Sequence, residues 1–311
     1  MIDEMESITA KLCSFARAYH SNHVKDKIFD DYLAYDLMGK EEYEKTGQLI
    51  EHDYNAHLYD PAYNFSGVRI LDKLNKYISP IPLSRAAFAE RELTRFVMQC
   101  GECQYVICGA GMDTFAFRNI NPNIKVFEID HPDTQRYKLE KIKNLEWNIP
   151  KNVRYVSVDF AVDDMADELI KAGFNPKEPS IFAIPGVTYY LTLPVFEETL
   201  GKICSVSSYG SKLVFDFPDE TTFGANPVGR VRELAEITKL LGEPMLHGYS
   251  VEEINDALKR HGFIIDVHES PQKIQKRFFD GRSDGQTAFE NIHFILAKKS
   301  DDFNESYYLY I

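Results

Sequence analysis

The amino-acid sequence predicts an α/β fold: a doubly wound, mainly parallel sheet of seven strands with a helical cap before it. Three observations lead to this prediction. Seven short apolar runs occur from residue 104 onward, and segments with helical spacing of apolar residues separate most of them. The first hundred residues contain no convincing strand. Strands that alternate with helices at this spacing are typical of a parallel sheet with helices on both faces.

Length and composition are those of a globular protein with room for a substantial core. The 311 residues are 44% hydrophobic and 27% charged, and the net charge is −13. A surface this acidic repels phosphate backbones and anionic lipid, so we expect neither nucleic acid nor a membrane as a partner. No apolar run reaches the ~18 residues of a membrane span, and the acidic N-terminus does not resemble a signal peptide. These features predict a soluble, cytoplasmic protein and leave its oligomeric state open.

Residues 1–98 are predicted to form a helical cap or lid. They are rich in charged residues and tyrosine, with apolar residues at helical spacing. Residues 80–82, which include two prolines, are expected to interrupt the helical pattern. Ser84 is then the predicted N-cap of a helix that runs through Phe96.

Residues 99–311 are predicted to form the α/β core. Each predicted strand is an apolar run, and several end in a glycine or an acid, as expected where a strand gives way to a turn. The segment 219–260 is extra material between the fifth and sixth strands, with two helical signals. The predicted strands are 104–108, 124–130, 153–159, 180–186, 212–217, 263–267 and 292–297, and the predicted helices are 133–145, 165–172, 194–207, 231–241 and 251–260.

The five cysteines form no pattern with a chemical role. Cys100 and Cys103 make a CxxC, but a structural zinc site needs two further ligands at matching spacing, and no second CxxC or HxxxH is present. A thioredoxin-type pair follows a strand, whereas this pair precedes one. We therefore expect neither a disulfide framework nor a metal site.

Polar residues at the ends of the first three predicted strands outline a ligand site. In open α/β sheets, ligands bind at the carboxyl ends of the strands, near the point where the strand order reverses. Gly109 and Gly111 follow the first strand, where glycines let the backbone approach a bound molecule. Asp130 ends the second strand, where an acid accepts hydrogen bonds from ribose hydroxyls. Asp159 ends the third strand, and we expect it to hold the nucleobase of the same ligand.

The loop after the first strand favours a nucleoside without a phosphate chain. A dinucleotide site needs G-x-G-x-x-G, and Thr114 stands at the third glycine position. Asp113 places a carboxylate beside the turn where a pyrophosphate would bind, and no G-x-x-x-x-G-K-[ST] loop is present. These features favour S-adenosylmethionine as the cofactor and disfavour a nicotinamide-linked oxidoreductase. In the alternative interpretation, Asp130 and Asp159 are ordinary turn residues at strand ends.

Two stretches of the sequence resemble a known family. Residues 106–114 read VICGAGMDT, and residues 127–132 read FEIDHP. They resemble the leucine carboxyl methyltransferase family, and residues 242–244 (GEP) and 261–263 (HGF) resemble its bacterial polyketide-synthesis O-methyltransferase branch. The resemblance covers roughly residues 10–300. It implies a Rossmann-like methyltransferase fold, S-adenosyl-L-methionine as the cofactor and a small-molecule methyl acceptor.

The resemblance also implies roles for single residues. Arg85 is similar to the arginine that pairs with the carboxylate of the cofactor's methionine part, a two-pronged contact that suits a guanidinium. Arg17 corresponds to a second basic contact from the lid, and Asp159-Phe160 resembles the pair that reads adenine. The cofactor-binding set implied in this way is Arg17, Arg85, Gly109, Gly111, Asp130, Asp159, Phe160 and Pro185.

One position departs from the family pattern. After the fourth strand the family usually carries Glu-Gly, with the glutamate facing the methionine end of the cofactor, whereas here the pair is Pro185-Gly186. A carboxylate near the sulfonium is therefore missing, and proline also lacks an amide donor. Three consequences stay open: a lower cofactor affinity, another acid in its place, or a non-catalytic nucleoside-binding protein. Tyr190 keeps the family's Tyr-Leu pattern and is a candidate on the substrate side.

Methyl transfer to a carboxylate needs no general base, because the acceptor is already ionised at pH 7. Catalysis then rests on holding oxygen, methyl and sulfur in line in a dry pocket, so no catalytic residue is assigned with certainty. A hydroxyl acceptor would need a base, for which His131 and His247 are the candidates. The predicted function is O-methyl transfer to a small-molecule carboxylate or hydroxyl in polyketide or secondary metabolism.

Overall fold

The computed structural model describes residues 7–54, 70–159, 162–225 and 227–301. Within them, the predicted strands form one sheet of seven in the order β3-β2-β1-β4-β5-β7-β6. Neighbours among β1 to β5 are parallel, and β7 runs antiparallel to both β5 and β6. The α/β fold with a mainly parallel sheet is therefore confirmed. The strands are β1 (Cys103–Cys108), β2 (Ile124–Asp130), β3 (Val153–Ser157), β4 (Ser180–Ile184), β5 (Lys212–Pro218), β6 (Phe263–Glu269) and β7 (Ile292–Lys299).

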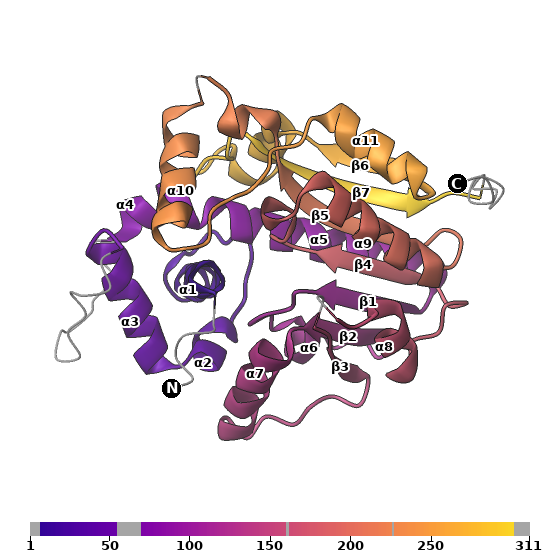
Figure 1. The fold of residues 1–311 in the computed structure, drawn as a ribbon. Helices are drawn as coiled ribbons and strands as arrows, with labels where there is room; N and C mark the ends of the chain where they lie inside the picture. The colour runs from indigo at the N-terminus through magenta and orange to yellow at the C-terminus, as the bar shows by residue number, and fades with distance from the viewer. Residues whose placement is uncertain (1–6, 55–69, 160–161, 226, 302–311) are drawn as a thin grey trace.

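The strand order reverses beside β1, and this fixes where a ligand can bind. The chain first builds outward from β1 to β2 and β3, then returns to place β4 on the other side of β1. Tyr105 of β1 accordingly pairs with Val126 of β2 on one side and with Ile181 of β4 on the other. The carboxyl ends of β1 and β4 point toward the cap helices (Figure 1). This is the edge at which ligands bind in doubly wound sheets.

Helices cover both faces of the sheet, as the continuous burial of β1, β4 and β5 requires. Side chains of β1 illustrate this: Tyr105 and Ile107 pack in one cluster with α5, and Val106 and Cys108 pack in another with α8, α9 and α11. The remaining elements follow in chain order. They are α1 (Ile8–His23), α2 (Ala34–Met38), α3 (Lys40–Glu51), α4 (Leu71–Lys73), η3 (Leu74–Ile78), α5 (Pro80–Cys100), α6 (Phe115–Arg118), α7 (Pro132–Asn144), α8 (Met165–Lys171), η4 (Thr188–Tyr190), α9 (Leu193–Val206), η5 (Glu220–Phe223), α10 (Gly229–Leu240), α11 (Val251–Arg260), α12 (Pro271–Ile274) and η6 (Gln275–Phe279).

The start of α5 differs from the prediction. The helix begins at Pro80, so Ser84 is not its N-cap but lies inside it, where its hydroxyl donates to the Pro80 carbonyl at 2.5 Å. The prolines do not interrupt the helix because its first turn has no intrahelical use for their missing N–H groups. The helix then continues past residue 98 to Cys100 and packs Phe88 and Leu93 into the core of the sheet.

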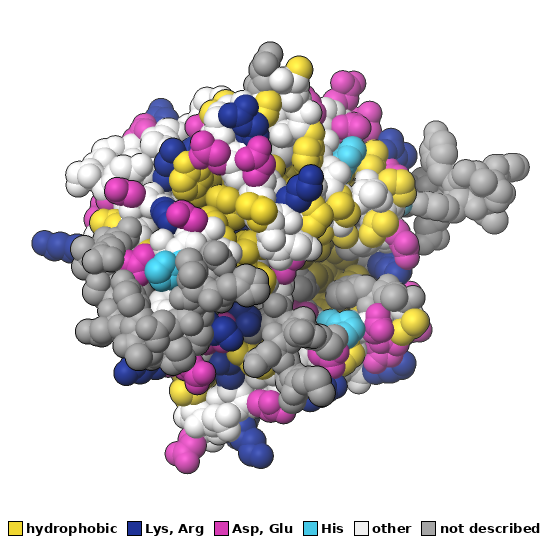
Figure 2. Space-filling view, turned by 60° about the vertical axis from the view of Figure 1, so that its left-hand side comes forward, with side chains coloured by type: hydrophobic (Ala, Val, Ile, Leu, Met, Phe, Trp, Pro, Cys, Tyr) yellow, Lys and Arg dark blue, Asp and Glu magenta, His cyan; other side chains and the backbone are white. Residues whose placement is uncertain are grey.

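The cap helices have a small core of their own. Phe15 of α1 stacks on Tyr43 of α3 with ring centroids 4.5 Å apart, and Ile78 of η3 joins the same cluster. Figure 2 turns this side of the molecule toward the viewer and shows hydrophobic side chains gathered around a hollow. Among the helices that the structure describes, none has the length and apolar character needed to cross a bilayer.

Candidate functional site

A cavity of about 360 Å³ is bounded by the cap helices and the carboxyl ends of the central strands. Its lining comes from α1, α5 and α10 and from the loops that follow β1, β2 and β4. Asp159, two residues beyond the end of β3, is not part of this lining, and Phe160 lies outside the described residues. The predicted site residues that the cavity brings together are Arg17, Arg85, Gly109, Gly111, Asp130, Pro185 and Tyr190.

The loop after β1 is closed by two glycines and one carboxylate. Gly109 has φ +70°, and a Cβ there would lie 3.1 Å from Val187 Cγ2. Gly111 has φ +49°, and its amide donates to Asp130 Oδ2 at 2.5 Å. Both glycines adopt the left-handed conformation that other residues rarely accept. The loop therefore brings backbone to the cavity surface with Asp130 beside it.

Asp130 stands at the end of β2 with both carboxylate oxygens engaged. Oδ1 accepts from the amide of His131 at 2.7 Å, while Oδ2 accepts from Gly111. Burial raises the pKa of Asp130, and the two amides oppose that rise. The carboxylate is thus fixed in direction, and each oxygen retains lone-pair capacity for a ligand in the cavity.

Arg85 reaches the cavity from α5 and lies against Gly186. A Cβ at Gly186 would sit only 2.3 Å from Arg85 Nη1 and 2.7 Å from Cζ, so the guanidinium packs on the bare backbone of that residue. Arg85 Nη1 donates to Asp216 Oδ2 at 3.3 Å, and Nη2 contacts Cys13 Sγ at 3.5 Å. Burial disfavours the charge, but the Asp216 carboxylate prevails and raises the pKa of Arg85. The cavity therefore contains a permanent cation in a defined place.

Asp216 is the site residue that the sequence analysis missed. It sits on β5 with 1% of its side chain exposed and accepts hydrogen bonds from the Gly186 amide and the Tyr189 hydroxyl, both at 2.7 Å, besides Arg85. Burial and the nearby Asp216 carboxylate raise the pKa of Tyr189 far above its usual value. A signal was present, because Asp216 is the one acid of β5 and stands between Phe215 and Phe217.

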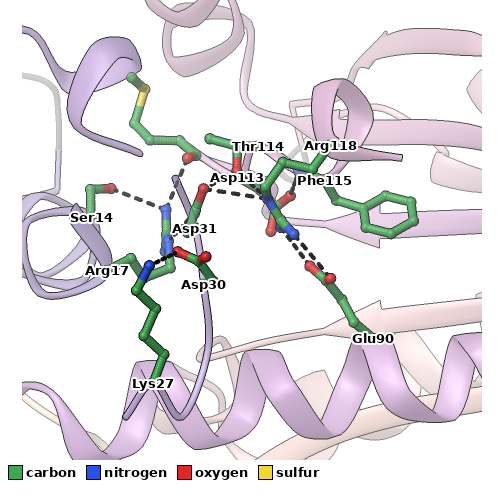
Figure 3. Close-up of polar contacts among 11 residues, drawn as sticks. Ser14, Arg17, Lys27, Asp30, Asp31, Glu90, Asp113, Thr114, Phe115 and Arg118 are labelled. Atoms are coloured by element: carbon green, nitrogen blue, oxygen red, sulfur yellow. Dashed lines mark hydrogen bonds and ion pairs between the residues drawn. The ribbon is translucent and has the colours of Figure 1, made fainter. Parts of the chain in front are cut away.

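Arg17 is held in a polar network that links the cap to the core (Figure 3). Its Nε donates to Asp31 Oδ2 at 2.9 Å, and its Nη2 donates to the Met112 carbonyl at 2.9 Å. Asp31 is 1% exposed and also accepts from the hydroxyl of Thr114. The guanidinium of Arg17 thus fastens α1 to the loop after β1 while its side chain lines the cavity.

The same network continues through α6 to α5. Arg118 Nε donates to Thr114 Oγ1 at 2.8 Å, and its two terminal nitrogens donate to the Glu90 carboxylate at 2.5 and 3.1 Å. Burial raises the pKa of Glu90, although Arg118 opposes the rise. Asp113, nearby, accepts at 2.7 Å from the amide of Phe115, the first residue of α6. The carboxylates of Glu90 and Asp113 on this side of the cavity therefore both accept hydrogen bonds from groups of the protein.

Tyr190 connects the loop after β4 to the beginning of the cap. Its hydroxyl lies 3.1 Å from Thr9 Oγ1, and burial raises its pKa to about 12. The Glu243 carboxylate accepts from the Ile8 amide at 2.7 Å and from the Ser7 hydroxyl at 2.8 Å. The segment between β5 and β6 therefore holds the first turn of α1 over the cavity.

Neither candidate histidine base lies in the cavity lining. His131 is the N-cap of α7, where Nδ1 accepts from the Asp133 amide at 3.3 Å. The ring of His247 packs edge-on against Tyr249 at 4.6 Å between centroids. A loop position next to a strand end does not by itself direct a side chain into the cavity.

Comparison with known proteins adds evidence from the whole chain. The sequence pattern of the leucine carboxyl methyltransferase family matches residues 10–204 of this chain. YktD of Bacillus subtilis, provisionally named an S-adenosyl-L-methionine-dependent methyltransferase, is 35% identical over 94% of this chain and 98% of its own. Franean1_4929 of Parafrankia, named in the same way, is 28% identical over 74% and 70%. A solved DUF574 family protein from Streptomyces avermitilis shares the fold, with a TM-score of 0.53, 14% identity and coverage of 81% and 97%.

Proposed function

This chain belongs to the leucine carboxyl methyltransferase family and is an S-adenosylmethionine-dependent methyltransferase, and we propose that it methylates an oxygen of a small carboxylic acid. The proposal includes a place in polyketide or other secondary metabolism, in keeping with the residues GEP at 242–244 and HGF at 261–263. One observation carries it: the described lining of the cavity contains no histidine, and its acids are engaged by donors of the protein, so it offers no free base for a hydroxyl acceptor.

The residues present fit S-adenosylmethionine. Gly109 and Gly111 leave bare backbone at the cavity wall, and Asp130 offers a fixed carboxylate at the strand end where a ribose is bound in sheets of this type. Arg85 offers a cation for the methionine carboxylate. We assign Arg17, Asp159 and Phe160 to the same cofactor on the resemblance of their sequence positions.

The acids of the lining are poor candidates for a base. Glu90 accepts from Arg118, Asp113 from the Phe115 amide, and Asp130 from two amides. Tyr190, with a pKa of about 12, stays protonated at neutral pH. A hydroxyl acceptor would need one of these groups to take up a proton, whereas a carboxylate is ionised without help.

When bound, S-adenosylmethionine would supply an electrophilic methyl carbon, so that a C–O bond to the acceptor carboxylate would form as the C–S bond broke and left its electron pair on sulfur. The protein's share is positioning. Arg85 binds and orients the methionine carboxylate of the cofactor. Helix α1, which Glu243 and Arg17 hold in place, keeps water out of the cavity. A dry site favours a reaction in which opposite charges neutralise each other on the way to the transition state. Good alignment of the reacting atoms lowers the barrier by about 7–11 kcal/mol.

Pro185 motivates the alternative of a nucleoside-binding protein without turnover. The position that carries glutamate in the family indeed lines the cavity here as proline. Asp216 nevertheless supplies a carboxylate to the neighbouring Gly186 amide and to Arg85. Asp216 is not part of the cavity lining, but it still holds Gly186 and Arg85 in place, and for this reason we favour the enzyme over the binding protein.

The test uses the full chain, S-adenosylmethionine labelled on the methyl group, and a panel of carboxylic acids and alcohols. We expect label in a product that base hydrolyses to methanol, as esters but not ethers do. The rate should be flat from about pH 6 to 8, because neither the acceptor nor Tyr190 titrates there. The variants His131→Gln and His247→Gln should match the wild type. The carboxylate assignment would be overturned by a product that is stable to base, formed at a rate that rises through pH ~6.5 in the wild type but not in one of the two variants.

Asp130→Ala should lower the affinity for S-adenosylhomocysteine more than tenfold in calorimetry. The change leaves ribose hydroxyls without an ionic partner, at about 1.5–3 kcal/mol for each hydrogen bond. In the wild type the raised pKa of Asp130 means that acidification protonates it at a higher pH than an exposed aspartate, so affinity should decline from that higher pH. Asp133→Ala, three residues on and outside the cavity lining, is the control. A change of less than threefold in a folded Asp130→Ala protein would contradict the placement of the ribose.

A further inference from the structure

The lining of the cavity changes character along α5. Its lining residues run from Ile81 and Pro82 in the first turn, through Arg85, to Ala89 and Glu90. At a rise of about 1.5 Å per residue, Ile81 is about 6 Å from Arg85 along the helix axis. On the Glu90 side the neighbours are the loop after β1 and the Arg118 network. Arg85 therefore marks the border between a polar end and an apolar end.

The apolar end has a second wall on α10. Leu234, Ile237 and Thr238 line the cavity at the i, i+3, i+4 spacing of one helix face, and Met245 follows them. Two polar groups here are already used, since Thr238 donates to the Ala235 carbonyl at 3.0 Å and Tyr77 bonds to Glu233. None of the described lining residues at this end is a cation or a carboxylate.

One polar atom at this end has no partner. The hydroxyl of Tyr54 is buried and makes no hydrogen bond with any described residue, yet Tyr54 lines the cavity and packs with the cluster that contains Ile78. Its backbone is also unusual, because Asp53 and Tyr54 both have positive φ, at 54° and 63°. Non-glycine residues adopt this conformation at a cost, and such strain clusters at ligand sites. An unpaired buried hydroxyl is costly, and a ligand oxygen that reached it through a small shift of the side chain would remove that cost.

From these two observations we infer the class of acceptor: an acid with an apolar body that lies between α5 and α10, and one uncharged oxygen near its far end that bonds to the Tyr54 hydroxyl. This rests on the proposed carboxyl methylation, which places the reacting carboxylate on the Arg85 side. A second charge at the far end would be desolvated without a partner, which is costly. The acceptor is therefore an acyl or aryl monocarboxylic acid with a distal hydroxyl or carbonyl group.

The experiment measures binding of three acids of equal length to the full protein saturated with S-adenosylhomocysteine. The probes are octanoate, ω-hydroxyoctanoate and suberate, and ester formation with S-adenosylmethionine is followed in parallel. We expect the wild type to bind ω-hydroxyoctanoate at least fivefold tighter than octanoate, and suberate at least tenfold weaker than octanoate. Tyr54→Phe should abolish the preference for the hydroxy acid and leave octanoate binding unchanged.

Leu234→Glu should weaken both monocarboxylates at least tenfold, with affinity for S-adenosylhomocysteine within twofold of the wild type. Leu240→Glu makes the same change on the same helix at a side chain that is 80% exposed, and it should alter nothing. Equal binding of suberate and octanoate, no binding of either monocarboxylate, or full octanoate binding by Leu234→Glu would overturn the inference. Equal losses for both monocarboxylates in Tyr54→Phe would overturn the role of that hydroxyl. Binding as expected without any ester would instead overturn the proposed function and leave the inference about the cavity standing.

Discussion

Asp216→Asn is expected to weaken S-adenosylhomocysteine binding at least tenfold and to lower the free energy of unfolding by about 3 kcal/mol. Three donors converge on this buried carboxylate: the Gly186 amide, the Tyr189 hydroxyl and Arg85. Asparagine replaces one accepting oxygen by a donating amide, so at least one of the three donors loses its partner, and two do if Oδ2 is the oxygen replaced. The charge of Arg85 then stays in a largely buried place without compensation. We take the lower end of the range for a broken buried pair because 17% of the Arg85 side chain is exposed.

Calorimetry and denaturant unfolding measure the two effects, with Asp266→Asn as the matched control. Asp266, on β6, pairs with Lys212 of β5 but is 43% exposed, so its loss should cost less than about 1 kcal/mol and leave binding unchanged. Tyr189→Phe removes a single donor and keeps the charge pair, and we expect an intermediate loss of affinity. If Asp216→Asn bound the ligand within twofold of the wild type, Asp216 would not position Arg85.

Gly186→Ala is expected to reduce S-adenosylhomocysteine affinity at least tenfold as well. The new Cβ would lie 2.3 Å from Arg85 Nη1 and 2.8 Å from Nη2, a separation that real atoms do not adopt. The guanidinium has to leave its place, and its hydrogen bond with Asp216 goes with it. Alanine at φ +72° adds a backbone cost of about 1–2 kcal/mol, which lowers stability independently of the ligand.

Gly101→Ala separates these two contributions. Gly101 ends α5 with φ +82°, and a Cβ there would have no atom within 4 Å. The variant should show only the backbone part of the stability loss of Gly186→Ala, because it disturbs no ion pair, and its ligand binding should be unchanged. Equal effects of both alanines on binding would mean that backbone strain, rather than contact with Arg85, controls the site.

Where the elements lie could be predicted from the sequence with few exceptions. The first run, predicted at 104–108, is β1 at Cys103–Cys108, and the last, predicted at 292–297, is β7 at Ile292–Lys299. Buried strands of a parallel sheet need apolar side chains on both faces, and this requirement is written locally in the chain. The exception was the start of α5. Near a helix terminus, proline either interrupts a helix or occupies its first turn, and serine either caps the helix or lies inside it. Which of these occurs depends on which turn packs against the sheet.

Several residues of the site could also be predicted from their immediate neighbours in the chain. Gly109, Gly111 and Asp130 stand directly at strand ends, and parallel strands bring their carboxyl ends to one edge whatever the rest of the chain does. The histidines show the limit of that argument, since His131 also follows a strand end but turns its ring to cap α7. Asp159, two residues beyond the end of β3, is not part of the described lining.

By itself, the sequence determined the sheet, the loop glycines and the acid that follows β2, because each depends on residues adjacent in the chain. Only the tertiary structure decided that Asp216 fixes Arg85, which lies 131 positions earlier in the chain, and that Tyr54, Leu234 and Met245 line one cavity. Hydrogen bonds and apolar contacts of this kind carry no sequence spacing of their own. They form because folding excludes water and leaves each buried charge or hydroxyl to be matched by whatever group the other elements bring near it.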